Sequence, residues 1–171
     1  IKHKNHFLLI DIDKPPQKKF SKSYQSGPLS FEYFLDGIKI ITNSGFGYQI
    51  SKKAELLSRL TACQSTLTVN ETSITKFEKN DMINKVFGNS IQNSFRSFDI
   101  SEKNDTDIIG CSASNNGYER EFGCTHKRDV YVDKKNNYLK GTDYIFKTKD
   151  GYPVRYAFRF HINPDLSVVK T

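Results

Sequence analysis

An apolar–polar alternation around one tight turn limits the fold of this chain more than any other feature. The segment LSFEYFL (29–35) places four apolar or aromatic side chains on one face and Ser30 and Glu32 on the other, which is typical of a half-buried strand. The Asp-Gly pair at 36–37 is the signal of a primed two-residue turn. The segment IKIIT (38–42) then returns beside the first strand, so the pattern predicts an antiparallel hairpin.

Several other segments have the composition and spacing of short strands. They cover residues 6–12, 65–70, 107–114, 126–132, 138–146 and 154–162. Turn-forming residues separate the later segments, including DKKNN (133–137) and a second Asp-Gly pair at 150–151. In the last segment, VRYAFRFHI, apolar residues alternate strictly with Arg155, Arg159 and His161. Short strands with turn signals between them favour an antiparallel sandwich.

Helical signals are few in this sequence. The segment KAELLSRL (53–60) is the one helix candidate, and the mixed polar and apolar residues of 79–107 indicate irregular loops with brief strands. We therefore predict an all-β fold, an antiparallel, supersandwich-like β-sandwich with at most one short helix. Because neither a repeat nor a low-complexity linker interrupts residues 1–171, we expect them to form one domain.

Length and composition agree with a β domain that lies outside the membrane. A chain of 171 residues can build one ordinary core, and its 13% aromatic content favours strands. No run of about 18 apolar residues is present, so we expect no membrane-spanning segment. The start, IKHKNHFLLIDID, lacks the pattern of a signal peptide, and the end, RFHINPDLSVVKT, stops within a strand pattern. We expect a fragment of a longer chain.

The net charge is +7, from 26 Lys and Arg residues against 19 acidic ones. The excess lies mainly in residues 126–159, where a basic sheet face could hold an anionic polymer such as nucleic acid or an acidic polysaccharide. The alternative is a solvated, lysine-rich surface, which the excess of Lys over Arg favours because dedicated anion recognition tends to use Arg. Since no RNA-recognition or OB-fold signature is present, we expect no nucleic-acid partner.

Four blocks of sequence occur in an order that is shared with a known family. They are SGPLSFEYFLDGIKIITNSG, SRLTACQSTLTVNET, NNGYEREFGCTHKRDVYVD and FRFHINP. Together they resemble the C-terminal β-sandwich domain of the heparinase II/III-like family of polysaccharide lyases. The resemblance implies a partner N-terminal α/α toroid in the same protein, a periplasmic location, and β-elimination on uronic-acid-containing polysaccharides. In that reaction a base removes the proton α to the carboxyl group, and an acid protonates the leaving oxygen.

The resemblance also identifies candidate binding residues. The family's His-x-His loop falls on Ser23 and Gln25, a metal-binding Asp falls on Asn43, and a His of the second block falls on Gln64. Hydroxyl and neutral amide groups are poor zinc ligands, so we expect neither the zinc of some family members nor another cofactor. The three amides either form a cluster that holds the loops by mutual hydrogen bonds or line a sugar-binding cleft.

Four further residues are candidates, each with a structural alternative. His126 and His161 are candidates for acid or base catalysis, or they are hydrogen-bonded within the sheet. Arg59 could bind a substrate carboxylate or anchor the loop at 43–48. Tyr118 is a candidate proton donor or a buried packing residue.

Two functional hypotheses follow from these residues. In the first, the chain is the sandwich domain of a polysaccharide lyase-like protein, inactive alone because the toroid carries much of the catalytic equipment. In the second, it is a non-catalytic carbohydrate-binding or structural domain, as the substituted metal-ligand positions suggest. An acidic polysaccharide is the expected partner in the first hypothesis.

Overall fold

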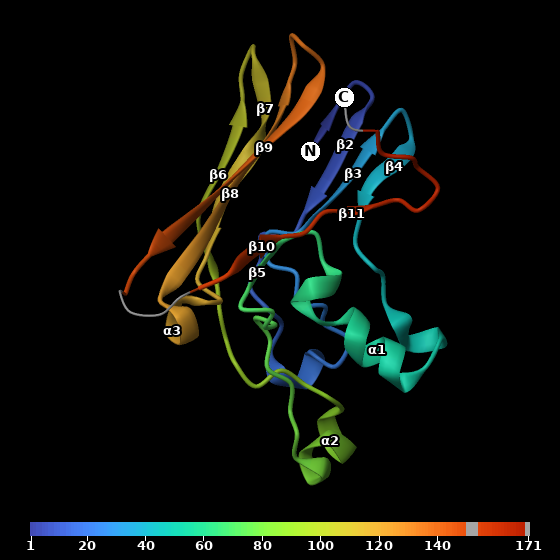
Figure 1. Cartoon of the computed structure of the whole chain (residues 1–171), viewed down its shortest axis with the longest axis vertical. Helices are drawn as coiled ribbons and strands as arrows, with labels where there is room; N and C mark the ends of the chain where they lie inside the picture. Colours follow the sequence, from blue (N-terminus) through green and yellow to red (C-terminus); the bar gives the residue numbers. More distant parts are fainter. Residues whose placement is uncertain (150–153, 170–171) are drawn as a thin grey trace.

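The chain forms two antiparallel sheets that face each other, with loops and short helices gathered at one end (Figure 1). This computed structural model describes residues 1–149 and 154–169, apart from the side chain of Phe87. The Asp-Gly turn predicted at 150–151 lies outside the described residues. Within these ranges, no helix is both long and apolar enough to cross a membrane.

The first sheet has five strands in the order β1-β2-β3-β4-β11. Their bounds are β1 Lys2–His3, β2 His6–Ile10, β3 Phe31–Leu35, β4 Ile38–Thr42 and β11 His161–Ile162. Asp36 and Gly37 connect β3 to β4 with positive φ angles of 53° and 79°, as a primed turn requires. The hairpin that the sequence predicts is therefore confirmed.

The second sheet is a four-stranded meander in the order β6-β7-β8-β9. Its strands are β6 Ser97–Asn104, β7 Ile108–Asn115, β8 Cys124–Asp133 and β9 Tyr138–Lys147. Along β8 every second side chain is buried, so that Arg128, Val130 and Val132 point between the two sheets. The opposite side chains of β8 and β9 form the outer face of this sheet.

A small sheet of β5 (Leu67–Val69) and β10 (Tyr156–Phe158) lies where the two larger sheets meet the loops (Figure 1). The prediction of one continuous strand over 154–162 is wrong, because β10 pairs with β5 whereas β11 pairs with β4 in the five-stranded sheet. Between them, the backbone N–H of Arg159 donates to the carbonyl of Thr66 at 3.0 Å. The apolar–polar alternation correctly predicts that both pieces are strands. It does not predict that they pair with strands of different sheets.

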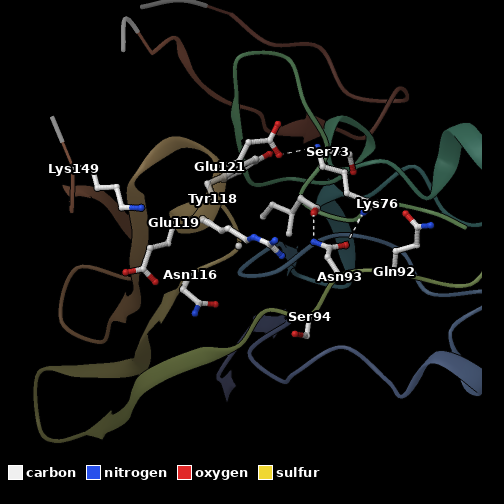
Figure 2. A pocket seen from close by; sticks show the side chains of 13 residues that line it. Ser73, Lys76, Gln92, Asn93, Ser94, Asn116, Tyr118, Glu119, Glu121 and Lys149 are labelled. Carbon is white, nitrogen blue, oxygen red and sulfur yellow. Dashed lines mark hydrogen bonds and ion pairs between the residues drawn. The ribbon is translucent and has the colours of Figure 1, made fainter. Parts of the chain in front are cut away.

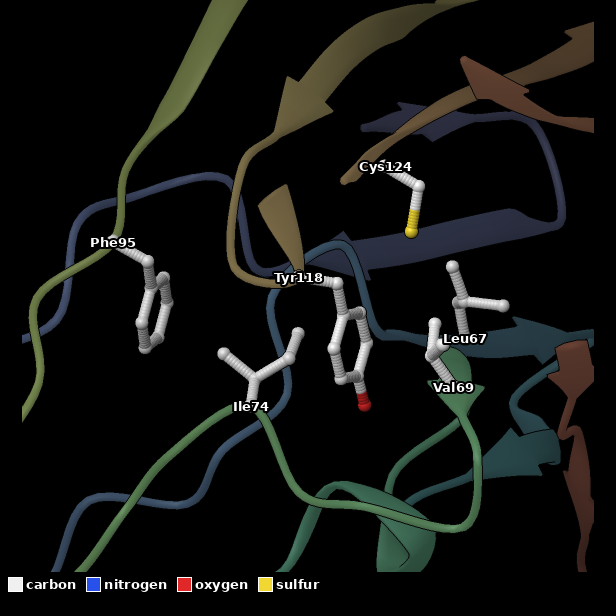
Figure 3. Packing of buried hydrophobic residues seen from close by; sticks show 6 residues of the cluster. All are labelled: Leu67, Val69, Ile74, Phe95, Tyr118 and Cys124. Atoms are coloured by element: carbon white, nitrogen blue, oxygen red, sulfur yellow. The ribbon is translucent and has the colours of Figure 1, made fainter. Parts of the chain in front are cut away.

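Two apolar clusters form the core. The first contains Leu8, Phe31 and Tyr33 of the five-stranded sheet together with Cys111 and Val130 of the four-stranded sheet. Because its members come from both sheets, it shows that they pack face to face as a sandwich. The second cluster lies at the loop end (Figure 3) and consists of Leu67, Val69, Ile74, Phe95, Tyr118 and Cys124. The predicted all-β, antiparallel class is confirmed.

The helices are short and lie at the loop end. They are α1 Lys52–Ser58, α2 Asp81–Phe87 and α3 Glu119–Phe122, with the 3-10 turns η1 Lys18–Phe20, η2 Gly47–Gln49 and η3 Thr61–Cys63. The helix predicted at 53–60 corresponds to α1, which Ser51 caps through the backbone N–H of Ala54. The irregular loops with brief strands predicted for 79–107 are found at 92–96 and in the strand β6, whereas the helix α2 in the same segment was not expected.

Candidate functional site

The side chain of Arg128 is the point where segments far apart in the sequence meet. It is 1% exposed, and its Nη1 donates hydrogen bonds to the carbonyl oxygens of Leu29 at 2.6 Å and Ser65 at 2.8 Å. Its Nε and Nη2 donate to the two carboxylate oxygens of Asp143 on β9, at 2.7 and 3.1 Å. This bidentate pair compensates a charge that is otherwise expensive to bury.

Two aromatic rings complete the surroundings of the Arg128 guanidinium. The ring centroids of Phe31 and Phe160 lie 5.2 and 5.5 Å from its central carbon, within the range of a cation–π contact. All four sequence blocks therefore contribute to one assembly around the buried guanidinium, which we call the Arg128 hub; its member Phe160 is 47% exposed. It consists of Leu29, Phe31, Ser65, His126, Arg128, Asp143 and Phe160.

His126 belongs to this hub and is buried. Its Nε2 lies 2.7 Å from Oδ1 of Asp143. Burial lowers the pKa of His126 below its ordinary value, although the hydrogen bond with Asp143 opposes the shift. Burial alone would raise the pKa of Asp143, but its hydrogen bonds with His126 and Arg128 lower it overall. At neutral pH a neutral imidazole therefore donates its Nε2–H to an ionised carboxylate.

The other two catalytic candidates lie in separate hydrogen-bond arrangements. His161 places Nε2 3.1 Å from the carbonyl oxygen of Ala62, and its backbone N–H donates to Ser65 Oγ at 3.0 Å. The buried Tyr118 donates its hydroxyl to the carbonyl of Thr72 at 2.7 Å and packs in the second cluster (Figure 3). Burial raises the pKa of the Tyr118 hydroxyl. The structure does not combine His126, His161 and Tyr118 into one constellation.

The segments that carry Gln25, Asn43 and Gln64 lie next to one another, and the amides of Asn43 and Gln64 bind the backbone. Asn43 accepts the backbone N–H of Ser65 at 2.8 Å, and the buried Gln64 donates Nε2 to the carbonyl of Ser58 at 2.9 Å. Among the described residues, these amides make no hydrogen bonds with each other. They join three loops through the main chain rather than as an amide cluster.

Arg59 holds a different loop from the one that we expected. Its side chain is 0% exposed and donates to the carbonyl oxygens of Tyr24 at 3.0 Å and Ser21 at 2.9 Å. The guanidinium also stacks on Phe77, 4.2 Å from the ring centroid. Burial lowers the pKa of Arg59. Arg59 therefore anchors the loop 21–24, not the loop 43–48, and it presents Ser23 at the surface.

A network of hydroxyl groups fixes the same loop from inside. Ser26 Oγ lies 2.9 Å from Thr61 Oγ1 and accepts the Thr75 hydroxyl at 2.6 Å. The loop also carries the exposed Ser23 and the partly buried Gln25. Across residues 1–149 and 154–169, no three His, Cys, Asp or Glu side chains are arranged to hold a metal ion. Neutral amides that already bind the backbone do not fit the zinc of the family.

An open groove lies beside α3 (Figure 2). Its volume is about 720 Å³, and a second hollow of about 610 Å³ adjoins it through Gln92, Asn93 and Ser94. We call the two together the loop-end groove. Its connection to the loop 21–26 is indirect: the buried Ser26 binds Thr75, and the next residue, Lys76, lines the groove.

The groove combines neutral polar groups with charged ones. Asn93 braces it by accepting the backbone N–H of Lys76 and donating to the carbonyl of Ile74, both at 2.7 Å. The Lys76 ammonium pairs with Glu121 at 2.9 Å. Arg120 is exposed, and no carboxylate of the described residues lies within ion-pair distance of it. Amide, hydroxyl and guanidinium groups in one groove suit a ligand with hydroxyl and carboxylate groups.

Sequence reasoning missed the hub and most of the groove. The strand pattern of residues 126–132 contained one signal for the hub. Arg128 is two and four residues away from Val130 and Val132, so it lies on the same buried face of the strand. Nothing comparable marked Gln92, Asn93 and Ser94, which lie in the segment that was predicted to be irregular.

The fold and the hub define a two-layer antiparallel β domain whose layers are connected by a buried, ion-paired arginine. The sequence model of the family "Heparinase II/III-like, C-terminal" matches residues 1–171, and the chain belongs to this family. The resemblance of the four blocks is therefore confirmed. Comparison with curated proteins and with solved structures gives no match.

Proposed function

We propose that this domain is the substrate-contacting β-sandwich of a polysaccharide lyase-like protein that cleaves uronic-acid-containing polysaccharides by β-elimination. The family match over residues 1–171 carries the proposal. The loop-end groove supports it, because amide and hydroxyl groups that suit sugar hydroxyls lie beside the cation of Arg120.

The domain holds the acidic chain, and the proton transfer belongs to the N-terminal α/α toroid. The imidazole of His126, the imidazole of His161 and the hydroxyl of Tyr118 are all engaged in hydrogen bonds inside the fold. A general base must instead have a free acceptor atom that can reach the proton α to the uronate carboxyl group. These observations favour binding over catalysis for this chain.

Arg120 is the residue that we assign to the uronate carboxyl group. A bidentate guanidinium–carboxylate pair fixes the sugar and stabilises the charge that develops when the α proton leaves. Ser23 and Gln25 contribute hydroxyl and amide contacts from the neighbouring loop. Arg59 fixes that loop through the carbonyl oxygens of Tyr24 and Ser21. Gln64 and Asn43 bind the backbone of Ser58 and Ser65 instead.

The test is a turnover assay of the full-length protein on alginate and heparin, read as the ultraviolet absorbance of unsaturated products. We expect product with the wild type and about tenfold lower kcat/KM with Arg120→Ala, since the loss of one charge-assisted contact has this size. Arg155→Ala removes an exposed arginine outside the groove and is the matched control. Absence of product on both polymers would contradict the proposal.

A non-catalytic carbohydrate-binding domain is the second candidate. The loss of zinc-type ligands at Gln25, Asn43 and Gln64 favours it, because the side chains of Asn43 and Gln64 now bind the backbone. It predicts retention of alginate or heparin on an affinity gel without any unsaturated product. Comparing the two readouts on one preparation separates the candidates.

A further inference from the structure

The outer face of the four-stranded sheet carries exposed aromatic side chains. Tyr144 and Phe146 of β9 are 42% and 51% exposed, and their rings are stacked at 6.3 Å with an interplanar angle of 16°. Tyr138, 47% exposed, lies on the same side of β9 because it is an even number of residues away. Exposed rings that gather on one face of a domain mark a binding surface more often than scattered ones do.

A shallow groove of about 560 Å³ runs across this face. The register of the strands places Phe98, Ser114, Lys127 and Tyr144 in one row across all four strands. Thr125 and Phe146 are paired in the next position of β8 and β9. Ser101 and Ser112 line the same groove, and the Ser112 hydroxyl donates to the Asp129 carboxylate at 2.5 Å. Aromatic rings thus flank a floor of small hydroxyl groups.

We infer that this face binds a linear acidic oligosaccharide at a site separate from the loop-end groove. A sugar ring has an apolar face of C–H groups, which can stack on the aromatic rings. Its polar edge of hydroxyls can contact the serine and threonine residues that line the groove. The ligand class rests on the proposed function. The site itself rests on the arrangement of the outer face.

Lysine side chains on this face provide cations for an acidic occupant. Lys103, Lys127 and Lys140 point outward, as do Asp129 and Asp133, and Asp99 lines the groove. The Lys127 ammonium lies 3.5 Å from Asp129. The Lys127 ammonium lies 5.5 Å from the ring centroid of Tyr144, so a cation is held beside the stacking surface. An anionic group of a bound sugar would take the place of Asp129 beside Lys127 while its ring stacks on Tyr144.

The spacing of the rings suits an extended chain. Tyr138 and Tyr144 are six residues apart on one strand, which corresponds to ~20 Å at the usual rise of an antiparallel strand. Lys140 lies between them on the same side. A polymer that follows β9 would meet an aromatic ring at each end of this stretch and a cation within it.

The outer face of the five-stranded sheet provides a matched control. It also exposes aromatic rings, because Phe7 and Phe34 lie 5.7 Å apart on β2 and β3. The row across these strands is Lys2, Phe7, Phe34 and Lys39, and the Lys39 ammonium lies 5.5 Å from the ring centroid of Phe34, but the row contains no serine or threonine. This face therefore tests whether exposed rings with lysines beside them bind the sugar without the hydroxyl-lined groove.

The experiment measures dissociation constants of the 171-residue chain for alginate and heparin oligosaccharides by isothermal titration. We expect Tyr144→Ala combined with Phe146→Ala to weaken binding about tenfold, as loss of an aromatic anchor does, while Phe7→Ala combined with Phe34→Ala changes nothing. Lys127→Gln should weaken binding less and reduce its salt dependence. Thermal unfolding checks that every variant is folded.

Three results would overturn the inference. The first is unchanged affinity of the Tyr144 and Phe146 variant. The second is absence of wild-type binding to both oligosaccharides. The third is dissociation of a dimer by this variant in sedimentation velocity, which would make the face a contact between two copies. The proposed function is judged separately by product formation and Arg120→Ala, so either idea can fail alone.

Discussion

The Arg128 hub and the loop-end groove both contain charged and polar side chains, but they use them in opposite ways. In the hub, the Arg128 guanidinium donates to Asp143 and to two backbone carbonyls, and it is 1% exposed. In the groove, Arg120 is exposed to solvent. Polar groups that satisfy one another stabilise the fold, whereas an exposed and uncommitted group is available to a ligand.

This contrast changes how the family's sequence blocks are understood. The blocks meet at the hub, so their shared pattern in this chain describes how two sheets and three loops are joined. The groove residues that we propose for polysaccharide binding lie beside the blocks, at Gln92, Asn93 and Ser94, or on the exposed surface of one block, at Arg120. In this chain the block residues that form the hub are therefore architectural.

Removing the hub arginine should have the largest effect of the changes considered. Arg128→Ala leaves the Asp143 carboxylate with only His126 and strips two backbone carbonyls of their donors, so we expect a loss of about 3–5 kcal/mol in the free energy of unfolding. Urea unfolding measures it. Arg155→Ala is the exposed control, expected within about 0.5 kcal/mol of wild type.

If Arg128→Ala does not fold, Arg128→Lys provides the second test. Lysine keeps the charge but cannot reproduce the bidentate contact or the stacking between Phe31 and Phe160. We expect a folded protein that is measurably less stable than the wild type. Equal stability of Arg128→Lys and the wild type would show that the hub geometry does not matter.

The sequence was most informative where local chemistry determines the structure. The hairpin at 29–42 could be predicted because its alternation and the positive φ angles of Asp36 and Gly37 are local properties. The strand β6 could not, because it is an exposed edge strand without an apolar face. The hub depends on Asp143, which lies on the neighbouring strand and reaches Arg128 only after the sheet has formed.

Asp11 is the opposite case to the hub. It is a partly buried carboxyl group, and none of the described residues forms an ion pair with it. Burial is the main cause that raises the pKa of Asp11 to about 6. A backbone hydrogen bond from Asp13 lowers this pKa, and the negative charge of Asp13 raises it. The ordinary value is 3.8, so the folded state binds this proton more tightly than the unfolded state does. Its charged form therefore destabilises the fold increasingly as the pH rises from about 4 to 6.

Replacing this carboxyl should remove the penalty. We expect Asp11→Asn to stabilise the protein by about 2 kcal/mol at pH 7.5 and to have no such effect near pH 3, where Asp11 is protonated in both states. Urea unfolding across this pH range measures the difference. The exposed Asp165→Asn is the control. A stabilisation that is the same at both pH values would rule out ionisation of Asp11 as its cause.

The smallest effect concerns the ion pair between Lys76 and Glu121 in the groove. These side chains are 46% and 48% exposed, and their charges are 2.9 Å apart. An exposed pair is screened by water and salt, so a double-mutant cycle of Lys76→Ala and Glu121→Ala should give a coupling energy of about 0.5 kcal/mol that falls with added salt. The same cycle on Arg128 and Asp143 should give a coupling several times larger and little affected by salt, since both are buried in the hub. Similar coupling energies for the two pairs would contradict this comparison, because they would show that burial does not distinguish the ion pair of the hub from the ion pair of the groove.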